Sequence, residues 1–379
     1  MSIGPASWEV LTIGIVIPVL LVVFLVLRWR RLRFLGRTTG LITAQAAAIC
    51  AIGLLINAGS DLVTTWQAMA GSSAGMQVSA IRTRAAELPP LDAVTGSAWA
   101  RTADQVTADR ASASGSQVAT ISIHGAQTGY QLPAKVYLPG AYFADPSRTF
   151  PVLELLTGYP GSILSWTQAM GLQAELNARI ADGSVPPVIA VMPTQNPVAN
   201  RDSECVDATS GAHTKAATYL GSDVPQYIAQ HYRAATGRAN WVVGGYSTGG
   251  FGAADVGLHY NDQFGSIIFL SGYVRPILDS TTGPLFRHRH DGAAYDVTAM
   301  LGQHHLPVSI YLITAKDNKR DVRQADLLAS HIPPTDLVSF ETTSTGGHSF
   351  PVWRIGFDHA IRWIAGIHSQ SPTLGRPTS

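Results

Sequence analysis

The pentapeptide Gly-Tyr-Ser-Thr-Gly at residues 245–249 constrains the fold of this chain more than any other feature. Residues 241–243 before it are apolar, as in a short buried strand, and residues 250–258 after it are rich in glycine and alanine, as in a closely packed helix. A serine in the sharp turn between such elements adopts strained backbone angles, and the flanking glycines leave room for them. The turn also aims the first helical amides at a site where negative charge develops. We therefore predict that Ser247 is a nucleophile; the alternative is a purely structural turn.

Strand patterns alternate with helical patterns over most of the chain. Strands are expected at 118–123, 134–138, 152–156, 188–192, 241–243, 267–270, 308–313 and 337–342, and helices at 170–180, 218–231, 250–258, 322–331 and 352–364. This alternation predicts an α/β fold with a mostly parallel central sheet and helices on both faces. The first two strands suit an antiparallel edge of that sheet. Ligands bind such sheets at the carboxyl ends of the strands, which is where Ser247 lies.

A serine hydroxyl needs a base within hydrogen-bond reach and an acid that orients the base. In chains with this kind of serine turn, the acid precedes the histidine in sequence. His348 lies in the glycine-rich loop 345–350, between a strand and the last helix, so we predict that it is the base. Asp317 is the first carboxylate after the strand at 308–313 and is the predicted acid. Asp321 is the alternative, and either carboxylate could instead be a solvated loop charge.

Two backbone N–H groups are needed to bind the oxyanion that forms during acyl transfer. We predict that one belongs to Thr248, which follows the nucleophile. The other should come from the loop at 157–161, where Tyr159 is the natural donor because Pro160 has no N–H. An ordinary glycine turn is the alternative for this loop.

Three motifs carry a resemblance to a known enzyme family. They are residues 155–161 with Ser165 and Trp166, residues 245–250 followed by 263–264 and 270–272, and residues 347–350 with Trp353. Together they resemble the oxyanion loop, the nucleophile turn with its following strand, and the histidine loop of the putative-esterase branch of the α/β-hydrolases. That branch includes esterase D (S-formylglutathione hydrolase), feruloyl esterases and the secreted mycolyltransferases of actinobacteria. The resemblance covers residues 118–366.

The resemblance implies an α/β-hydrolase fold with Ser247, Asp317 and His348 as catalytic triad and with Tyr159 and Thr248 as oxyanion donors. Mycolyltransferases have Glu at the acid position, so an Asp there is closer to the esterases. Phe350 stands where the family's histidine loop often has tryptophan.

The N-terminal region is predicted to be a transmembrane hairpin. Residues 10–27 form an almost unbroken apolar run, and residues 38–60 form a second uncharged stretch. Five arginines lie between residues 28 and 37, and no basic residue precedes the first run. The positive-inside rule therefore places this loop in the cytoplasm and both termini, with the catalytic domain, on the extracytoplasmic side. A cleaved signal peptide is the alternative, although its positive charge would precede the apolar run.

These patterns predict four regions: a transmembrane hairpin at 1–62, a tether at 63–117, an α/β-hydrolase domain at 118–368 and a flexible tail at 369–379. The tether is assigned because its composition shifts to Ala, Ser, Thr and Gly, with little to bury. The two cysteines, Cys50 and Cys205, are expected to be free thiols.

Several other residues have weaker assignments. Trp166 and Trp353 could shape an acyl pocket, although tryptophan usually packs in the core. The acidic stretch at 202–207 could line the pocket or form an exposed loop. The Arg and His residues at 287–291 are predicted to form a solvated loop and not a metal site.

The sequence as a whole favours a membrane-anchored serine esterase or acyltransferase that forms an acyl-enzyme on Ser247. With a formal net charge of +1 and only 13% charged residues, nothing indicates a nucleic-acid partner. We expect an ester or acyl-lipid substrate, a sugar or lipid hydroxyl as a possible acceptor, and neither metal nor organic cofactor. The alternative is a catalytically silent hydrolase scaffold that serves as a binding module of the cell envelope.

Overall fold

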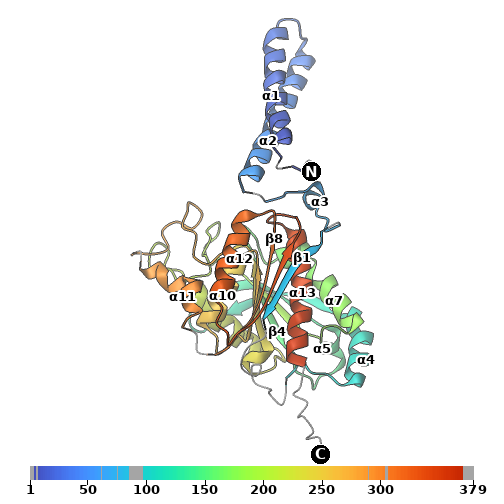
Figure 1. Ribbon diagram of the computed structural model, residues 1–379, viewed down its shortest axis with the longest axis vertical. Coiled ribbons are helices and arrows are strands. Elements are labelled where there is room, and N and C mark those ends of the chain that lie inside the picture. Colours follow the sequence, from blue (N-terminus) through green and yellow to red (C-terminus); the bar gives the residue numbers. More distant parts are fainter. Residues whose placement is uncertain are drawn as a thin grey trace, which may run out of the picture.

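The computed structural model describes residues 4–5, 7–60, 62–74, 76–84, 97–288, 290–303 and 306–369. Two long antiparallel helices, α1 (Trp8–Arg28) and α2 (Phe34–Ser60), stand at one end of an α/β domain, and the last described residue, Ser369, lies at the opposite end (Figure 1). The segment between hairpin and domain carries a short helix, α3 (Trp66–Met69).

The domain is built on one sheet, which has nine strands within the described residues, in the order β1-β9-β8-β7-β6-β4-β5-β3-β2. The strands are β1 (Val78–Arg84), β2 (Gln117–His124), β3 (Gln131–Leu138), β4 (Val152–Leu156), β5 (Ile189–Pro193), β6 (Trp241–Tyr246), β7 (Ser266–Leu270), β8 (Ser309–Ala315) and β9 (Leu337–Thr343). Strands β4 to β9 are parallel, whereas β2 and β3 form an antiparallel edge and β1 pairs antiparallel with β9. The predicted fold class is confirmed.

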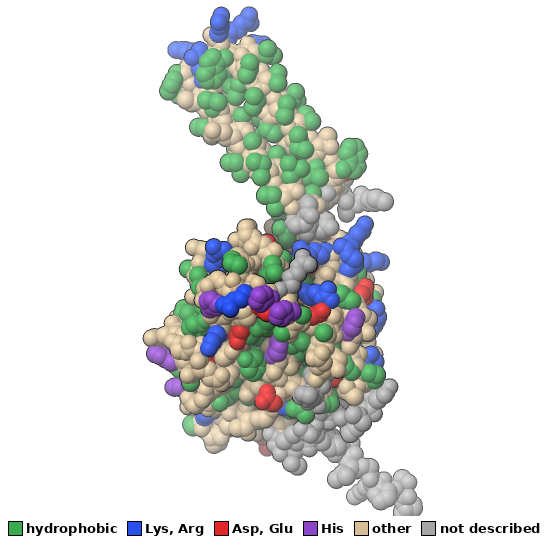
Figure 2. Space-filling model, turned by 90° about the vertical axis from the view of Figure 1, so that its left-hand side faces the viewer, with side chains coloured by type: hydrophobic (Ala, Val, Ile, Leu, Met, Phe, Trp, Pro, Cys, Tyr) green, Lys and Arg blue, Asp and Glu red, His purple; other side chains and the backbone are tan. Residues whose placement is uncertain are grey.

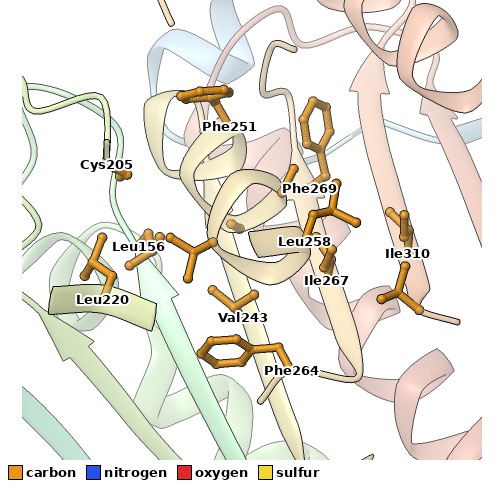
Figure 3. Packing of buried hydrophobic residues seen from close by; sticks show 14 of the residues in the cluster. Leu156, Cys205, Leu220, Val243, Phe251, Leu258, Phe264, Ile267, Phe269 and Ile310 are labelled. Atoms are coloured by element: carbon orange, nitrogen blue, oxygen red, sulfur yellow. The ribbon is translucent and has the colours of Figure 1, made fainter. Parts of the chain in front are cut away.

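One face of the sheet is covered by α9 (Val224–His231), α10 (Thr248–His259) and α12 (Lys319–His331). Alternate strand residues such as Val243 and Ile267 point to this face and form one hydrophobic core with the helices. Figure 3 shows Phe251 and Leu258 of α10 lying over the strands that carry these side chains. Because successive strand residues point to opposite faces, the intervening residues supply a second core.

The second core lies between the other face of the sheet and α7 (Leu172–Asp182), α13 (Phe350–Ser369) and the short α6 (Ser165–Gln168). Strand residues that alternate with the first set, among them Val242 and Ile268, pack against these helices. Further short helices are α5 (Gly140–Ala144), α8 (Ala216–Thr218) and α11 (Val297–Met300). Helices therefore cover both faces of the sheet, and a site is expected at the carboxyl ends of its parallel strands.

The hairpin helices are long and apolar enough to cross a membrane, judged by length and composition. Only 11% of each apolar window is buried, unlike the core helix of a soluble protein. Figure 2 shows hydrophobic side chains over the hairpin surface and Lys and Arg side chains gathered at its far end. Compared with the expected spans at 10–27 and 38–60, α1 begins two residues earlier and ends one residue later, and α2 begins four residues earlier.

The region expected to be a tether, residues 63–117, is partly built into the domain. Strand β1 adds an edge to the sheet through backbone hydrogen bonds to β9, and α4 (Ala103–Ser112) packs against α7. Asp109 of α4 is buried and forms ion pairs with Arg101 and Arg148. The expected tether with some helical content therefore differs from the structure at β1, which belongs to the sheet, and at α4, which packs on the domain. The expected tail beyond Ser369 lies outside the described residues.

Candidate active site

Ser247 occupies the turn between β6 and α10 with φ 56° and ψ −123°, a conformation that residues with a Cβ rarely adopt. Its N–H donates to Leu270 O at 3.0 Å, and its carbonyl accepts from the first turn of α10. A Cβ on Gly245 would lie 2.1 Å from Gly249 O, and one on Gly249 would lie 2.6 Å from the Leu156 backbone. Glycine is therefore required on both sides of the serine by close approach of the backbone.

His348 connects Ser247 to a carboxylate. Its Nε2 lies 2.8 Å from Ser247 Oγ, and its Nδ1 lies 2.7 Å from Asp321 Oδ2. The three side chains come from the turn after β6, the loop after β9 and the first turn of α12, all at the carboxyl ends of parallel strands. The imidazole also contacts the edge of Trp353, with ring centroids 4.9 Å apart.

Asp321, and not Asp317, is the carboxylate that contacts the imidazole. Asn318 caps α12 by accepting from the Asp321 N–H at 2.9 Å, so Asp321 lies in the first helical turn, where the helix dipole favours an anion. The prediction that Asp317 orients His348 directly is wrong. Its carboxylate instead accepts from the N–H groups of Gly346 and Gly347, both at 3.0 Å, and thereby holds the histidine loop.

The two predicted oxyanion donors, Tyr159 and Thr248, line the same cavity as Ser247. Thr248 is the first residue of α10, where N–H groups have no partner within the helix. The loop that carries Tyr159 packs directly on the nucleophile, because a Cβ on Gly158 would lie 2.9 Å from Ser247 Cβ. Within the described residues, neither the Tyr159 nor the Thr248 N–H donates to a backbone carbonyl.

Gln195, after β5, supports the same loop and was not predicted from the sequence. Its side-chain amide accepts from the Thr157 N–H at 2.7 Å and donates to Thr157 O at 2.8 Å. Gln195 is buried, so this pair of hydrogen bonds replaces water at the backbone of Thr157. A polar residue directly after a buried strand was the only sequence signal for this role.

A cavity of about 450 Å³ opens over Ser247, a volume in the range of small-molecule sites. Tyr159, Phe350 and Trp353 line part of its wall, whereas Trp166 is not among the lining residues. The Trp166 side chain is fully buried and its Nε1–H donates to Leu156 O at 2.9 Å. The prediction of a pocket role is therefore wrong for Trp166, which packs in the core beside Tyr246 and Phe357.

The opposite wall of the cavity is acidic. Asp202 and Glu204 line it and are almost fully buried, which rules out the exposed-loop alternative for these two residues. Tyr273 Oη lies 2.6 Å from Glu204 Oε2 and 3.2 Å from Thr248 Oγ1, and the Thr248 hydroxyl lies 3.3 Å from Asp202 Oδ2. This buried network fixes the side chain of Thr248, the residue that follows the nucleophile.

Burial controls the ionisation of the acidic wall. Desolvation raises the pKa of Asp202 to about 6. Desolvation, aided by repulsion from Asp202, raises the pKa of Glu204 to about 8. Near neutral pH, Glu204 is therefore mostly protonated and Asp202 mostly ionised, so the pair carries close to one negative charge. An uncharged or cationic group is favoured on this side of the cavity.

A model of the family described as Putative esterase matches residues 125–364 of the chain. An uncharacterized protein of Corynebacterium glutamicum is 29% identical over 245 residues, which cover 61% of this chain and 56% of that protein. The match thus spans little more than half the length of that relative.

Three solved structures are similar in fold. A ferulic acid esterase superposes with a TM-score of 0.56 at 17% identity, over 66% of this chain and 98% of that chain. An S-formylglutathione hydrolase from Agrobacterium tumefaciens superposes with a TM-score of 0.56 at 17% identity, over 66% of this chain and 95% of that chain. A fluorophosphonate-binding serine hydrolase of Staphylococcus aureus superposes with a TM-score of 0.53 at 18% identity, over 66% of this chain and 98% of that chain.

At these identities, the structural similarity shows a common fold. The family model covers well over half of the sequence, including the loop at 157–161, the serine turn and the histidine loop. We conclude that the chain belongs to the Putative esterase family.

Proposed function

We propose that this protein is a membrane-anchored, extracytoplasmic serine esterase or acyltransferase that acts on carboxylic esters, with acyl-lipid or other envelope esters as substrates. One observation carries the proposal: His348 lies between Ser247 Oγ and Asp321, at 2.8 and 2.7 Å. Family membership supports ester hydrolysis as the reaction.

In the first half-reaction, Ser247 Oγ attacks the ester carbonyl while His348 Nε2 removes the hydroxyl proton. Asp321 holds the imidazole through Nδ1 and stabilises the imidazolium that forms. The carbonyl oxygen becomes an oxyanion, for which the N–H groups of Tyr159 and Thr248 are the proposed donors. The tetrahedral intermediate collapses, His348 returns the proton to the leaving alcohol, and the acyl group remains on Ser247.

In the second half-reaction, a hydroxyl compound attacks the acyl-enzyme. His348 removes its proton, and the acyl group leaves Ser247, which regains a proton from His348. If the attacking compound is water, the product is a carboxylic acid, and if it is a sugar or lipid hydroxyl, the product is a new ester. Both reactions use the same residues and differ only in the acceptor.

The anchoring part of the proposal is supported by the two apolar helices and by the arginines between them. The positive-inside rule places those arginines in the cytoplasm, and the catalytic domain follows the second helix on the other side of the membrane.

Replacement of Ser247 by alanine tests the proposal. The full-length protein in detergent should be labelled by a fluorophosphonate probe and should hydrolyse p-nitrophenyl butyrate. Ser247→Ala should lose all labelling and nearly all turnover, because no acyl-enzyme can form. Ser222→Ala, at a serine that is hydrogen-bonded only to Gln127 in the described structure, is a matched control and should keep both activities. Labelling that persists in Ser247→Ala contradicts the proposal.

The alternative, a catalytically silent scaffold, gives a different result in the same assay. It predicts that the wild-type protein is not labelled, although Ser247, His348 and Asp321 are correctly placed.

A further inference from the structure

The last turn of α2 is connected to the histidine loop by a short series of contacts. The Asn57 side-chain amide exchanges two hydrogen bonds with the Val63 backbone, both at 2.8 Å. The next residue, Thr64, donates its hydroxyl to Asp317 Oδ2 and lies 3.3 Å from the Gly346 N–H. We call these four residues, Asn57, Val63, Thr64 and Asp317, the juxtamembrane clasp.

The segment beyond the clasp follows the same loop. Met76 packs against Gly346, where an added Cβ would approach the Met76 side chain to 2.9 Å. Gln77 O accepts from the Ser344 N–H at 2.8 Å, and β1 then pairs with β9. Side-chain and backbone contacts therefore hold the base of the hairpin to the end of the sheet that carries Ser247, as the position of the hairpin in Figure 1 illustrates.

One exposed leucine lines the cavity, and two more are sequence neighbours of residues that line it. Leu62 lines the cavity and is 38% exposed, although it lies only two residues beyond α2. Leu164 is 40% exposed and precedes the lining residue Ser165. Leu278 is 58% exposed and lies between the lining residues Ile277 and Asp279. We call Leu62, Leu164 and Leu278 the leucine rim.

Cationic side chains lie beside the leucine rim. Arg320 lines the cavity, and the exposed Lys316 and Lys319 are its close neighbours at the start of α12. An apolar rim with flanking Lys and Arg is the composition of surfaces that lie in the interface of a membrane, where apolar side chains enter the acyl boundary and cations meet lipid phosphates.

We propose that the leucine rim and its flanking cations dock on the outer surface of the bilayer, with the juxtamembrane clasp fixing that orientation. This inference rests on the proposed function, because it requires that α1 and α2 span the membrane. The occupant is the lipid surface and not a protein, because the two spans end beside the rim and bring the bilayer to it. Docking would place the cavity mouth within reach of an ester group in the outer leaflet.

A fluorescence experiment tests the docking. An environment-sensitive fluorophore is attached at Leu278→Cys or Leu164→Cys in the full-length Cys50→Ser protein; Cys205 is fully buried and can remain. The matched control is Leu306→Cys, which is 40% exposed but precedes β8 and so lies at the amino end of the strands. Each protein is reconstituted in phosphatidylglycerol-containing vesicles with and without a lipid that carries a nitroxide near its headgroup.

The proposal predicts that the nitroxide lipid quenches the labels at 278 and 164 at least threefold more than the label at 306. Equal quenching at the three positions would overturn it. Flotation of the vesicles and fluorophosphonate labelling are measured on the same samples. Protein that does not float with the vesicles refutes the membrane anchor and with it the docking. Docking without fluorophosphonate labelling leaves this inference standing and refutes the serine-hydrolase proposal.

Discussion

At the scale of single residues, two aspartates four positions apart contact the histidine loop in different ways. Asp321 bonds the imidazole of His348, whereas Asp317 bonds the backbone of the loop that carries it. Asp321 is therefore expected to act on the chemistry of the imidazolium, and Asp317 on the position of the loop. The second role is that of a positioning residue, because the Asp317 carboxylate bonds the loop backbone and, among the described hydrogen bonds, none joins it to the side chain of Ser247 or His348.

Glu204 gives a prediction about pH and stability. Its pKa is about 8 in the folded protein and near 4.5 in an unfolded chain, so the folded state binds more protons between these values. The free energy of unfolding should therefore fall as pH rises from 5 to 8, by about 1.4 kcal/mol for each pKa unit that separates the two states. Glu204→Gln should flatten this decline.

Urea unfolding of both proteins in detergent at pH 5, 6.5 and 8 measures the effect. Gln127→Glu, which changes a residue outside the cavity lining, is a control for added charge. A decline with pH that is equally steep in the wild-type protein and in Glu204→Gln would contradict the assigned ionisation of the acidic wall.

The residues at the site differ in how far the sequence could predict them. Ser247 was predictable because the residues that form its turn are adjacent in sequence. His348 was predictable because it lies in a loop and glycines precede it. The choice between Asp317 and Asp321 depends on where α12 begins, and the cap by Asn318 gives no strong signal in a run of charged residues. Asp202 and Glu204 were ambiguous because burial of their loop depends on contacts with Tyr273 and Thr248, which are distant in sequence.

At the scale of elements, α10 can lie close to the sheet because Gly257 lies where the helix meets the central strands. A Cβ on Gly257 would lie 2.6 Å from Ile267 Cγ1 and 3.0 Å from Val243 Cγ1. This close packing connects the serine turn to two central strands, and it explains why residues 250–258 are poor in large side chains.

Gly257→Ala should therefore destabilise the protein, although alanine favours helix. Forcing a methyl group into a packed core costs about 1–3 kcal/mol, which outweighs a gain of up to about 1 kcal/mol in helix propensity. Gly366→Ala in α13 is the matched control, because nothing lies within 4 Å of the added Cβ, and it should be neutral or stabilising. Thermal unfolding distinguishes the two variants; a Gly257→Ala protein as stable as Gly366→Ala would contradict the packing described.

Elements with hydrophobic alternation were predictable, and elements held by backbone contacts were not. The central strands and the helices on both faces were expected from their apolar patterns. Strand β1 was assigned to a tether because its side chains are mostly exposed and it joins the sheet by backbone hydrogen bonds to β9. Helix α4 was missed because its main buried side chain is Asp109, an ion-paired carboxylate that a hydrophobic pattern does not detect.

At the scale of the whole molecule, the juxtamembrane clasp connects the hairpin to the histidine loop beside the cavity. If the rim docks as proposed, turnover of an ester held in the bilayer should depend on Leu278, and turnover of a water-soluble ester should depend on it much less. The negative charge of the acidic wall further disfavours an ester that would bring an anionic group to this side of the cavity.

Vesicles that contain dioleoylglycerol and the full-length protein test this dependence. We expect release of oleic acid, measured by mass spectrometry, and a roughly tenfold lower rate for Leu278→Asp because the charge opposes entry into the interface. In the same variant, the rate with p-nitrophenyl butyrate should fall by a clearly smaller factor. The control Leu306→Asp should change neither the rate with dioleoylglycerol nor the rate with p-nitrophenyl butyrate. If the rates with both esters fall by the same factor in Leu278→Asp, then Leu278 supports the structure of the cavity and does not contact the membrane.

If Ser247, His348 and Asp321 act as one catalytic unit, acylation of Ser247 should depend on Asp321 far more than on Asp317. The acylation rate with p-nitrophenyl butyrate is measured by stopped flow in the wild-type protein, Asp321→Asn and Asp317→Asn. We expect a loss of about 10²–10⁴-fold for Asp321→Asn, because the imidazole loses its orienting anion, and a loss below about tenfold for Asp317→Asn. A larger loss for Asp317→Asn than for Asp321→Asn, in proteins of equal thermal stability, would contradict this expectation.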